Sequence, residues 1–509
     1  MGTKEKTNVL MVVADNQWAG ALGCYGNTEH RTPNLDRLAT EGIRFSHAFC
    51  TNGLCSPARA SILTGLIPSQ HGVHEPFNDG SWPSLPEDWQ AISQFRTLPL
   101  TLKNRGYQTA MIGKWHLGQY AKPAIGYEYW VVYPKGHTSD FYNNTVIDNG
   151  KEYPVKDRHI VDFWAEKAAE YVGNYDGKEP FYLQVNFNGP YVMPPTNFGP
   201  DPLNPFYKEF DGQAFKPFDQ HFSDKLMFQF TGPYDPDLPE EFSGDTEQIL
   251  NAQNRMMFDY IRMHNDPQTR ANIAAQNAMV DHGVGVISKA LETSGLEENT
   301  IVVYLSDHGM PFGHRGLWSG APMTFPAVMY DQNFNIPLIM RHKGTITEHI
   351  VSDMLVSEYD LMATLLDYVG YPDVVIPNSP GHSFAPVLRG QSMGDWVQAV
   401  YFEHEESRGI RTPRYSYWKR HRAAGKNELY DLTADPEANT DVYSKPEYAD
   451  ITQQLDAKVT TFFARYADPR YDLWNGGTAK LVSYRIELWQ KLYGANWKPT
   501  AQLLPAFEE

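Results

Sequence analysis

The chain has 509 residues, 61 of them acidic against 43 Lys and Arg, and a formal net charge of −18. Because nucleic acids and anionic membrane surfaces are polyanions, this charge excludes them as partners, but it does not exclude a small anionic ligand. Hydrophobic residues make up 41% of the chain. No run of about 20 apolar residues occurs, so no membrane span is predicted.

The beginning of the chain and its cysteines bear on the compartment. The first seven residues are polar and lead directly into an apolar run. No signal-peptide core is therefore expected, which predicts a cytoplasmic protein, or a periplasmic or secreted one if the chain has been trimmed. The three cysteines, Cys24, Cys50 and Cys55, do not indicate a disulfide framework.

Predicted strands and helices alternate through the first 300 residues. Short β-branched and apolar runs predict strands, and apolar residues at helical spacing predict helices. The strands are expected at 8–14, 108–112, 181–187 and 301–305, and the helices at 34–41, 60–66, 98–105, 160–171 and 272–294. Such alternation predicts a mostly parallel α/β sheet. Asp15 and Asp307 directly follow two of the strands, so we expect them to meet at the carboxyl edge of the sheet.

The periodicity fails between Gly189 and Glu247, where Pro, Phe, Tyr, Gly and Asp are frequent. This composition is as consistent with an ordered surface loop as with a pocket wall that selects a ligand. Later in the chain, short strands are expected at 399–404, 409–412 and 415–419, followed by a helix at 446–466. Because a chain of this length exceeds what one core serves, we predict a main domain at 1–394 and a smaller C-terminal subdomain with a tail at 395–509.

The run Cys55-Ser56-Pro57-Ala58-Arg59 is the most specific motif in the chain. Pro57 suits the first turn of a helix, because its missing N–H costs nothing there. Cys55 is therefore expected at the positive N-terminal end of a helix, which attracts anions. Arg59 follows one helical turn later, so its guanidinium can reach back towards Cys55.

Several further motifs accompany this run in a fixed order. They are Asp15-Asn16-Gln17, the segment 32–38, Leu63-Thr64-Gly65, the segment 68–73, Gly113-Lys114-Trp115-His116-Leu117-Gly118, Ser306-Asp307-His308-Gly309, the segment 361–366, Leu388-Arg389-Gly390 and the segment 428–432. Together they resemble the formylglycine-dependent sulfatases of the alkaline phosphatase superfamily, which also contains phosphonate monoester hydrolases. The resemblance implies a large, mixed, mostly parallel sheet flanked by helices, with a smaller C-terminal α+β subdomain of antiparallel strands and a helix.

The resemblance also implies how the ester would be cleaved. A formylglycine-generating enzyme or an anaerobic sulfatase-maturing enzyme would oxidise Cys55 to formylglycine. One hydroxyl of the hydrated aldehyde would attack the sulfur of a small-molecule sulfate ester, and the other would later expel sulfate. The same resemblance assigns catalytic positions around the sulfate to Arg59, Lys114 and His116. In an extended stretch the spacing of Lys114 and His116 would put both side chains on one face.

A divalent metal is implied at Asp15, Asn16, Asp307 and His308, with the oxidised side chain of Cys55 as a further ligand. Position 16 departs from the commonest family pattern, in which a second Asp stands. The oxygen ligands favour Ca²⁺, and the imidazole of His308 together with the amide of Asn16 leaves Mn²⁺ open.

Two other departures concern the leaving group. Many family members carry Pro-His where this chain has Pro190-Tyr191, and many carry a Lys near 316–321, where this chain has none. Tyr191, whose ordinary pKa is near 10, could donate a hydrogen bond, and His314 and Arg315 could supply cationic contacts in the substrate site. Because an activated phenol-like leaving group needs little protonation, these changes favour aryl sulfates, an unusual organic group or reduced activity.

Hydrolysis of sulfate monoesters is therefore the expected function. A phosphonate monoester or phosphodiester hydrolase of the same fold is the first alternative, because the group transferred is similar in size and shape. A non-catalytic binder of a sulfated ligand is the second. A homodimer is expected from the C-terminal tail, whose rings at Trp489, Tyr493, Trp497 and Phe507 need a packing partner.

Overall fold

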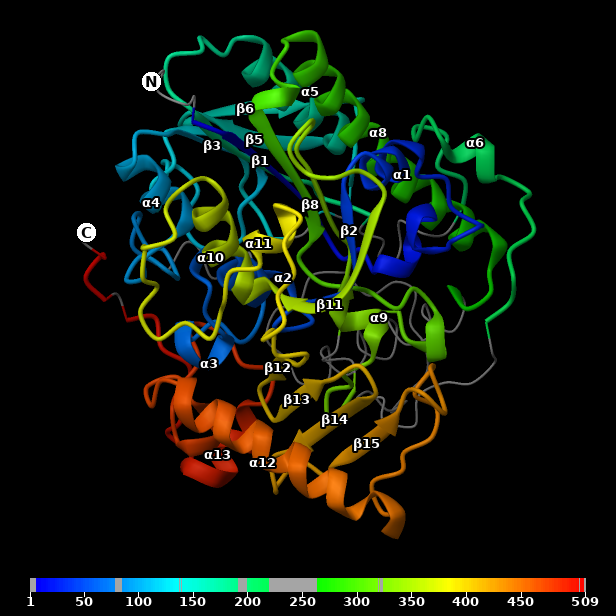
Figure 1. Ribbon diagram of the computed structural model, residues 1–509, viewed down its shortest axis with the longest axis vertical. Helices are drawn as coiled ribbons and strands as arrows, with labels where there is room; N and C mark the ends of the chain where they lie inside the picture. The colour runs from blue at the N-terminus through cyan, green and yellow to red at the C-terminus, as the bar shows by residue number, and fades with distance from the viewer. Residues whose placement is uncertain are drawn as a thin grey trace, which may run out of the picture.

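A large mixed sheet forms the centre of the molecule (Figure 1). The computed structural model describes residues 6–507 except 78–84, 137, 139, 191–198, 219–262, 319, 321–323 and 503. The eleven strands of this sheet run in the order β11-β2-β10-β8-β1-β7-β3-β4-β5-β6, with β9 paired to β2.

Five adjacent central strands are parallel: β8 (Thr300–Ser306), β1 (Asn8–Ala14), β7 (Phe181–Asn186), β3 (Gln108–Lys114) and β4 (Tyr129–Tyr133). Every residue of β1 is buried, because helices cover both faces of the sheet. The predicted mostly parallel α/β sheet is therefore confirmed.

The outer strands were not predicted. They are β2 (Ile43–Phe49), β5 (Asn144–Asp148), β6 (Lys151–Val155), β9 (Asn335–Ile336), β10 (Leu338–Arg341) and β11 (Ile350–Ser357). In β2, polar residues interrupt the apolar run, and the strand is defined by its partners: it pairs antiparallel with β10 and parallel with β11.

Helices cover both faces of the sheet. The helices α1 (Pro33–Thr40), α5 (Ile160–Gly173) and α8 (Pro267–Thr293) pack on one face, and α2 (Cys55–Thr64), α4 (Leu98–Asn104) and α10 (Glu358–Tyr368) pack on the other. The short helices are α3 (Pro68–His71), α6 (Tyr207–Phe210), α9 (Asp331–Phe334) and α11 (Ala385–Leu388). No helix among the described residues has the length and apolar character needed to cross a bilayer.

A second, antiparallel sheet follows in the C-terminal part of the chain. It consists of β12 (Val400–His404), β13 (Ser407–Arg411), β14 (Tyr415–Arg420) and β15 (Glu428–Asp431). The helix α12 (Ala449–Tyr466) packs against β13 and β14, as Figure 1 shows. The predicted small subdomain of antiparallel strands and a helix is present.

The C-terminal tail packs on its own chain. Trp489 in α13 (Ile486–Tyr493) is fully buried and contacts the rings of Tyr493 and Trp497. Phe507 lies beneath the guanidinium of Arg96. The aromatic rings therefore find partners within the chain, and they no longer argue for a dimer. All three cysteines are free.

Candidate active site

Cys55 is the first residue of α2, and 3% of its surface is exposed. Its Sγ atom lies 3.4 Å from Nε2 of His308 and 3.7 Å from Oδ1 of Asn16. Burial raises the pKa of the Cys55 thiol far above its usual range, and the charges of Asp15 and Asp307 add to this effect, while Lys114 opposes it. The position of Cys55 at the N-terminus of a helix therefore does not suffice to ionise its thiol, and the unmodified thiol is a poor nucleophile.

Two adjacent parallel strands bring the predicted metal ligands together. Asp15 and Asn16 follow β1, and Asp307 and His308 follow β8. The backbone N–H of Asn16, whose φ is 68°, donates to Oδ1 of Asp307 across 3.0 Å. Nδ1 of His308 lies 2.8 Å from its neighbour's carbonyl oxygen, at Gly309, so the other ring nitrogen faces Cys55. The orientation of the imidazole is thereby fixed.

The donor atoms in this cluster fit a metal ion. One ligand atom each from Asp15, Cys55, Asp307 and His308 lies within 4.8 Å of all the others, and all four residues are buried. Carboxylate oxygens and an imidazole nitrogen suit a divalent cation. The convergence of four such donor atoms on one buried point is the arrangement that a bound cation needs.

Two buried cations face the two carboxylates. Nζ of Lys114 lies 2.8 and 3.0 Å from the carboxylate oxygens of Asp15. Nε of Arg59 donates to Oδ2 of Asp307 across 3.0 Å, and its Nη2 lies 3.4 Å from Oδ1 of Asp15. Burial alone would raise the pKa of Asp15, but Lys114 and Arg59 hold it well below its usual range. Asp15 therefore stays ionised, as a metal ligand must.

His116 lies beside the first turn of α2, but the argument from an extended stretch was wrong. The strand β3 ends at Lys114, and His116 has a left-handed φ of 58°. Nε2 of His116 lies 2.9 Å from the carbonyl oxygen of Phe77, and the carbonyl of His116 accepts from Ser56. The left-handed turn at His116 and the contact with Phe77 orient this ring; the alternation of side chains along a strand does not.

No contact found among the described residues joins any of the three residues predicted for substrate binding to Cys55. Tyr191 lies outside the described residues. His314 packs between Trp18 and Phe218, with ring centroids 4.9 and 4.6 Å away, on the wall of a cavity of about 690 Å³. Arg315 lies over the ring of Tyr330 and donates to Oδ1 of Asn439. Phe218 comes from the aperiodic segment, so this part of the segment does contribute to a cavity wall.

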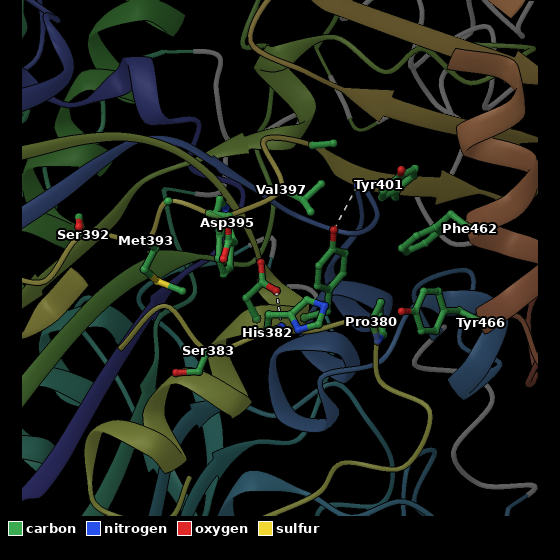
Figure 2. A pocket seen from close by; sticks show the side chains of 15 residues that line it. Pro380, His382, Ser383, Ser392, Met393, Asp395, Val397, Tyr401, Phe462 and Tyr466 are labelled. Atoms are coloured by element: carbon green, nitrogen blue, oxygen red, sulfur yellow. Dashed lines mark hydrogen bonds between the residues drawn. The ribbon is translucent and has the colours of Figure 1, made fainter. Parts of the chain in front are cut away.

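A second cavity, of about 630 Å³, lies between α10 and α12. Figure 2 shows the rings of Tyr401, Phe462 and Tyr466 on one of its sides and Met393 and Asp395 on another. None of the residues predicted for chemistry lines this cavity. Size alone therefore does not locate the chemistry.

The sequence analysis missed one buried polar cluster. His404, Glu405 and Glu406 lie at the end of β12 and are at most 1% exposed. Glu75, which follows the helix of the cysteine motif, is fully buried against them, with Oε1 2.9 Å from Nε2 of His404. The sequence carried one signal for this cluster, namely three consecutive ionisable residues at the end of a predicted strand. Charged residues are rarely fully buried unless they are paired.

The chain is similar to known proteins over most of its length. The sulfatase family profile matches residues 7–371, and the profile described as N-sulphoglucosamine sulphohydrolase, C-terminal, matches residues 326–464. An N-acetylglucosamine-6-O-sulfatase of Bacteroides thetaiotaomicron is 29% identical, over 89% of this chain and 86% of that protein. The human N-acetylglucosamine-6-sulfatase is 29% identical, over 81% and 70%.

A solved structure has the same fold. It is described as a complex with its substrate D-glucosamine-2-N,6-O-disulfate, and it aligns with a TM-score of 0.70 and 24% identity, covering 92% of this chain and 99% of that one. The match to the family profile covers well over half of the chain, and the motifs that contain Asp15, Cys55 and Asp307 converge on one buried site. The chain therefore belongs to the sulfatase family and is a hydrolase of sulfate esters.

Proposed function

We propose that the substrate is the sulfate ester of a carbohydrate, of the N-acetylglucosamine-6-sulfate type, rather than an aryl sulfate. The observation that carries the catalytic part of the proposal is the cluster in which Cys55, Asp15, Asp307 and His308 bring four donor atoms within 4.8 Å of one another. The two relatives named above, which act on N-acetylglucosamine 6-sulfates by their names, support the choice of the organic group.

A maturing enzyme would act on Cys55 in this proposal. Formylglycine at this position would supply a hydrated aldehyde, whose hydroxyl attacks sulfur and releases the alcohol. Support comes from the high pKa of the buried thiol, because a protonated cysteine would serve poorly as the nucleophile itself.

Asp15, Asn16, Asp307 and His308 would hold the metal, and we propose that it is Ca²⁺. When bound, it would add two positive charges to a site where Arg59 and Lys114 already balance Asp15 and Asp307, and so would favour charge developing on the sulfuryl oxygens. The side-chain oxygens of Asp15, Asn16 and Asp307 suit a hard cation.

The remaining side chains orient the reacting groups. Arg59 ties α2 to Asp307, and Lys114 holds the carboxylate of Asp15. His116 would accept a proton from the hydroxyl that collapses to expel sulfate. All three side chains are buried, so they are shielded from bulk water and their electrostatic interactions are stronger than at the surface.

Two measurements on protein co-expressed with a maturing enzyme test the proposal. Peptide mass spectrometry should find Cys55 lighter by about 18 Da, as expected for conversion of the thiol to an aldehyde. The matured enzyme should then release sulfate from N-acetylglucosamine 6-sulfate with a higher kcat/KM than from 4-nitrophenyl sulfate. An unmodified thiol in active protein would contradict the assignment of Cys55, and the reverse order of substrates would contradict the carbohydrate.

A further inference from the structure

A basic recess lies where the C-terminal sheet meets α12. It is a cavity of about 370 Å³ beside β13, β14 and the C-terminal half of α12, which pack together in Figure 1. Its lining includes Arg408 from β13, Lys419 and Arg420 from β14, and His421 and Arg422 from the turn that follows. No Asp or Glu is found among the described residues that line it. In a chain with a formal net charge of −18, this lining favours an anionic ligand.

Two of these cations lie directly opposite each other. Arg408 on β13 and Lys419 on β14 are partners in the antiparallel register, so their side chains leave the same face of the sheet. Like charges in such a pair repel each other. Nζ of Lys419 lies 2.9 and 3.0 Å from the carboxylate oxygens of Asp456 and donates to Oγ1 of Thr460 across 2.7 Å. Lys419 therefore adds charge to the recess, but its own N–H groups are occupied.

Arg408 is held rigidly and keeps donors for a ligand. The central carbon of its guanidinium lies 4.3 and 4.6 Å from the ring centroids of Phe463 and Trp474, which also line the recess. Nη2 donates to Oδ1 of Asp472 across 2.6 Å, and Nε lies 3.5 Å from Oε2 of Glu403. Although Arg408 is only 5% exposed, no hydrogen bond of its Nε or Nη1 is found within the described residues. Buried donors without an acceptor cost free energy, so a ligand that brings oxygen atoms here would be bound.

His421 and Arg422 complete the recess. Nδ1 of His421 accepts from the backbone N–H of Ala423 across 3.3 Å, so the neutral ring carries its hydrogen on Nε2. Burial lowers the pKa of His421, and the charges of Arg422 and Arg408 lower it further, which keeps the ring neutral at neutral pH. Arg422 is exposed, and within the described ranges no carboxylate pairs with it. Arg408, His421 and Arg422 therefore all offer hydrogen-bond donors to the same recess.

We propose that this recess is a second anion site, separate from the Cys55 site, and that it binds a sulfate group through Arg408, His421 and Arg422. A tetrahedral oxyanion presents several oxygen atoms at once, and a planar guanidinium can pair with two of them. The volume is at the lower end of the range of about 300–1,000 Å³ for small-molecule sites, so a sulfate group fits together with part of a sugar. No member of the Cys55 cluster lines the recess, and the inference goes beyond the proposed function.

The test needs a signal from the recess itself, because the Cys55 site also binds sulfate groups. Trp474 lines the recess, and its indole N–H donates to the carbonyl of Glu405 across 2.7 Å, so its indole NMR signal reports on this place. The signal is identified by its loss in Trp474→Phe. Trp396 supplies the reference signal, since its indole donates to the carbonyl of Leu355 at the cavity between α10 and α12. The protein is full-length Cys55→Ala with isotope-labelled tryptophan, in which the proposed nucleophile is removed.

Sodium sulfate should shift the Trp474 signal in a saturable way and leave Trp396 in place, and sodium chloride at equal ionic strength should not reproduce the shift. Arg422→Gln should raise the Kd for sulfate by about 10-fold or more, as expected for a lost hydrogen bond to a charged group. Arg414→Gln is the matched control, at an exposed ion pair with Asp431 beside the start of β14, and should change the Kd by less than about twofold. A Trp474 signal that does not move, an equal response to chloride, or an unchanged Kd in Arg422→Gln would overturn the inference.

A sulfate group could reach this recess from two sources, as inorganic sulfate or as a sulfate ester. The same titration with N-acetylglucosamine 6-sulfate distinguishes them. Tighter binding of the ester would assign the recess to the substrate, and tighter binding of inorganic sulfate would assign it to the product of hydrolysis. A Trp474 signal that responds to neither would overturn the inference, and this result would leave the proposed function intact, because neither Cys55 nor a metal ligand lies in the recess.

Discussion

Arg59 donates from Nε to Oδ2 of Asp307 across 3.0 Å, and its Nη2 lies 2.8 Å from the same oxygen. This fork joins the first turns of α2 to the residue that follows β8. Cys55, which is proposed to react, and the predicted metal ligands come from separate elements, so their relative position depends on this contact. A second contact of the guanidinium, with Asp15, extends the link to β1.

The first prediction concerns this fork. Arg59→Lys keeps the charge but loses the planar pair of donors, and so releases α2 from Asp307. We expect kcat/KM for sulfate ester hydrolysis to fall by about 100-fold or more, since small misplacements of reacting groups have effects of this size. The matched control is Arg37→Lys, at an exposed pair with Glu41 on α1. Full activity of Arg59→Lys would contradict a positioning role.

The second prediction concerns the space around His116. A Cβ atom at Gly136 would overlap Nε2 of His116, so Gly136→Ala should push the ring out of its place against Phe77. We expect a fall in kcat of about 100-fold or more, in the range of a lost general base, with little change in melting temperature. Gly173→Ala, at a position with open space at the end of α5, should have no effect. Unchanged kcat in Gly136→Ala would argue against a role of His116 in the reaction.

The third prediction concerns the metal. Removing it with a chelator would take away the ion that the donor atoms of Asp15, Asp307 and His308 would hold in common. We expect loss of activity and a lower melting temperature, because a ligand that binds the folded state stabilises it. Adding Ca²⁺ should restore both. Recovery with Mn²⁺ but not with Ca²⁺ would contradict the proposed metal, and elemental analysis of untreated protein gives an independent identification.

The fourth prediction concerns stability and pH. Burial, followed by the charge of Glu75, raises the pKa of Glu405 from 4.5 to about 8. Between these values the folded chain binds the proton and the unfolded chain does not, so raising the pH should lower the free energy of unfolding. Glu405→Gln should make this decline shallower between about pH 5 and pH 8, as measured by urea unfolding.

Other buried groups contribute to the remaining slope. Asp360 and His404 contribute with the same sign, whereas His74 and His159, whose pKa burial lowers to about 4, contribute with the opposite sign below pH 6.5, and Lys480, whose pKa burial lowers to about 7, does so above pH 7. The pKa of Asp360 is raised by burial to about 7, and that of His404 is raised to about 10 by Glu75 and Glu406 against the effect of burial. Glu447→Gln, at an exposed position, is the control and should not alter the slope. A pH dependence in Glu405→Gln that equals that of the wild type would show that Glu405 is ionised in the folded protein.

Local sequence determined much of the fold and of the catalytic cluster. The apolar run 8–14 could only be a strand buried on both faces, and Pro57 set the start of α2 at Cys55. Asp15 and Asp307 follow strands that are adjacent and parallel, so the rule that ligands gather at carboxyl edges was sufficient to bring them together. These features depend on a few neighbouring residues each.

Tertiary structure decided the rest. Hydrogen-bond partners from distant segments define β2, and a left-handed turn at His116 replaces the extended stretch that its spacing suggested. The recess at Arg408 forms only because α12 and Trp474 pack against β13 and β14. Burial and ion pairing between remote segments have no periodicity in the sequence, because they arise only when the chain has folded. The sequence by itself therefore determined the motif at Cys55 and the family it belongs to, and only the folded chain decided which side chains surround it.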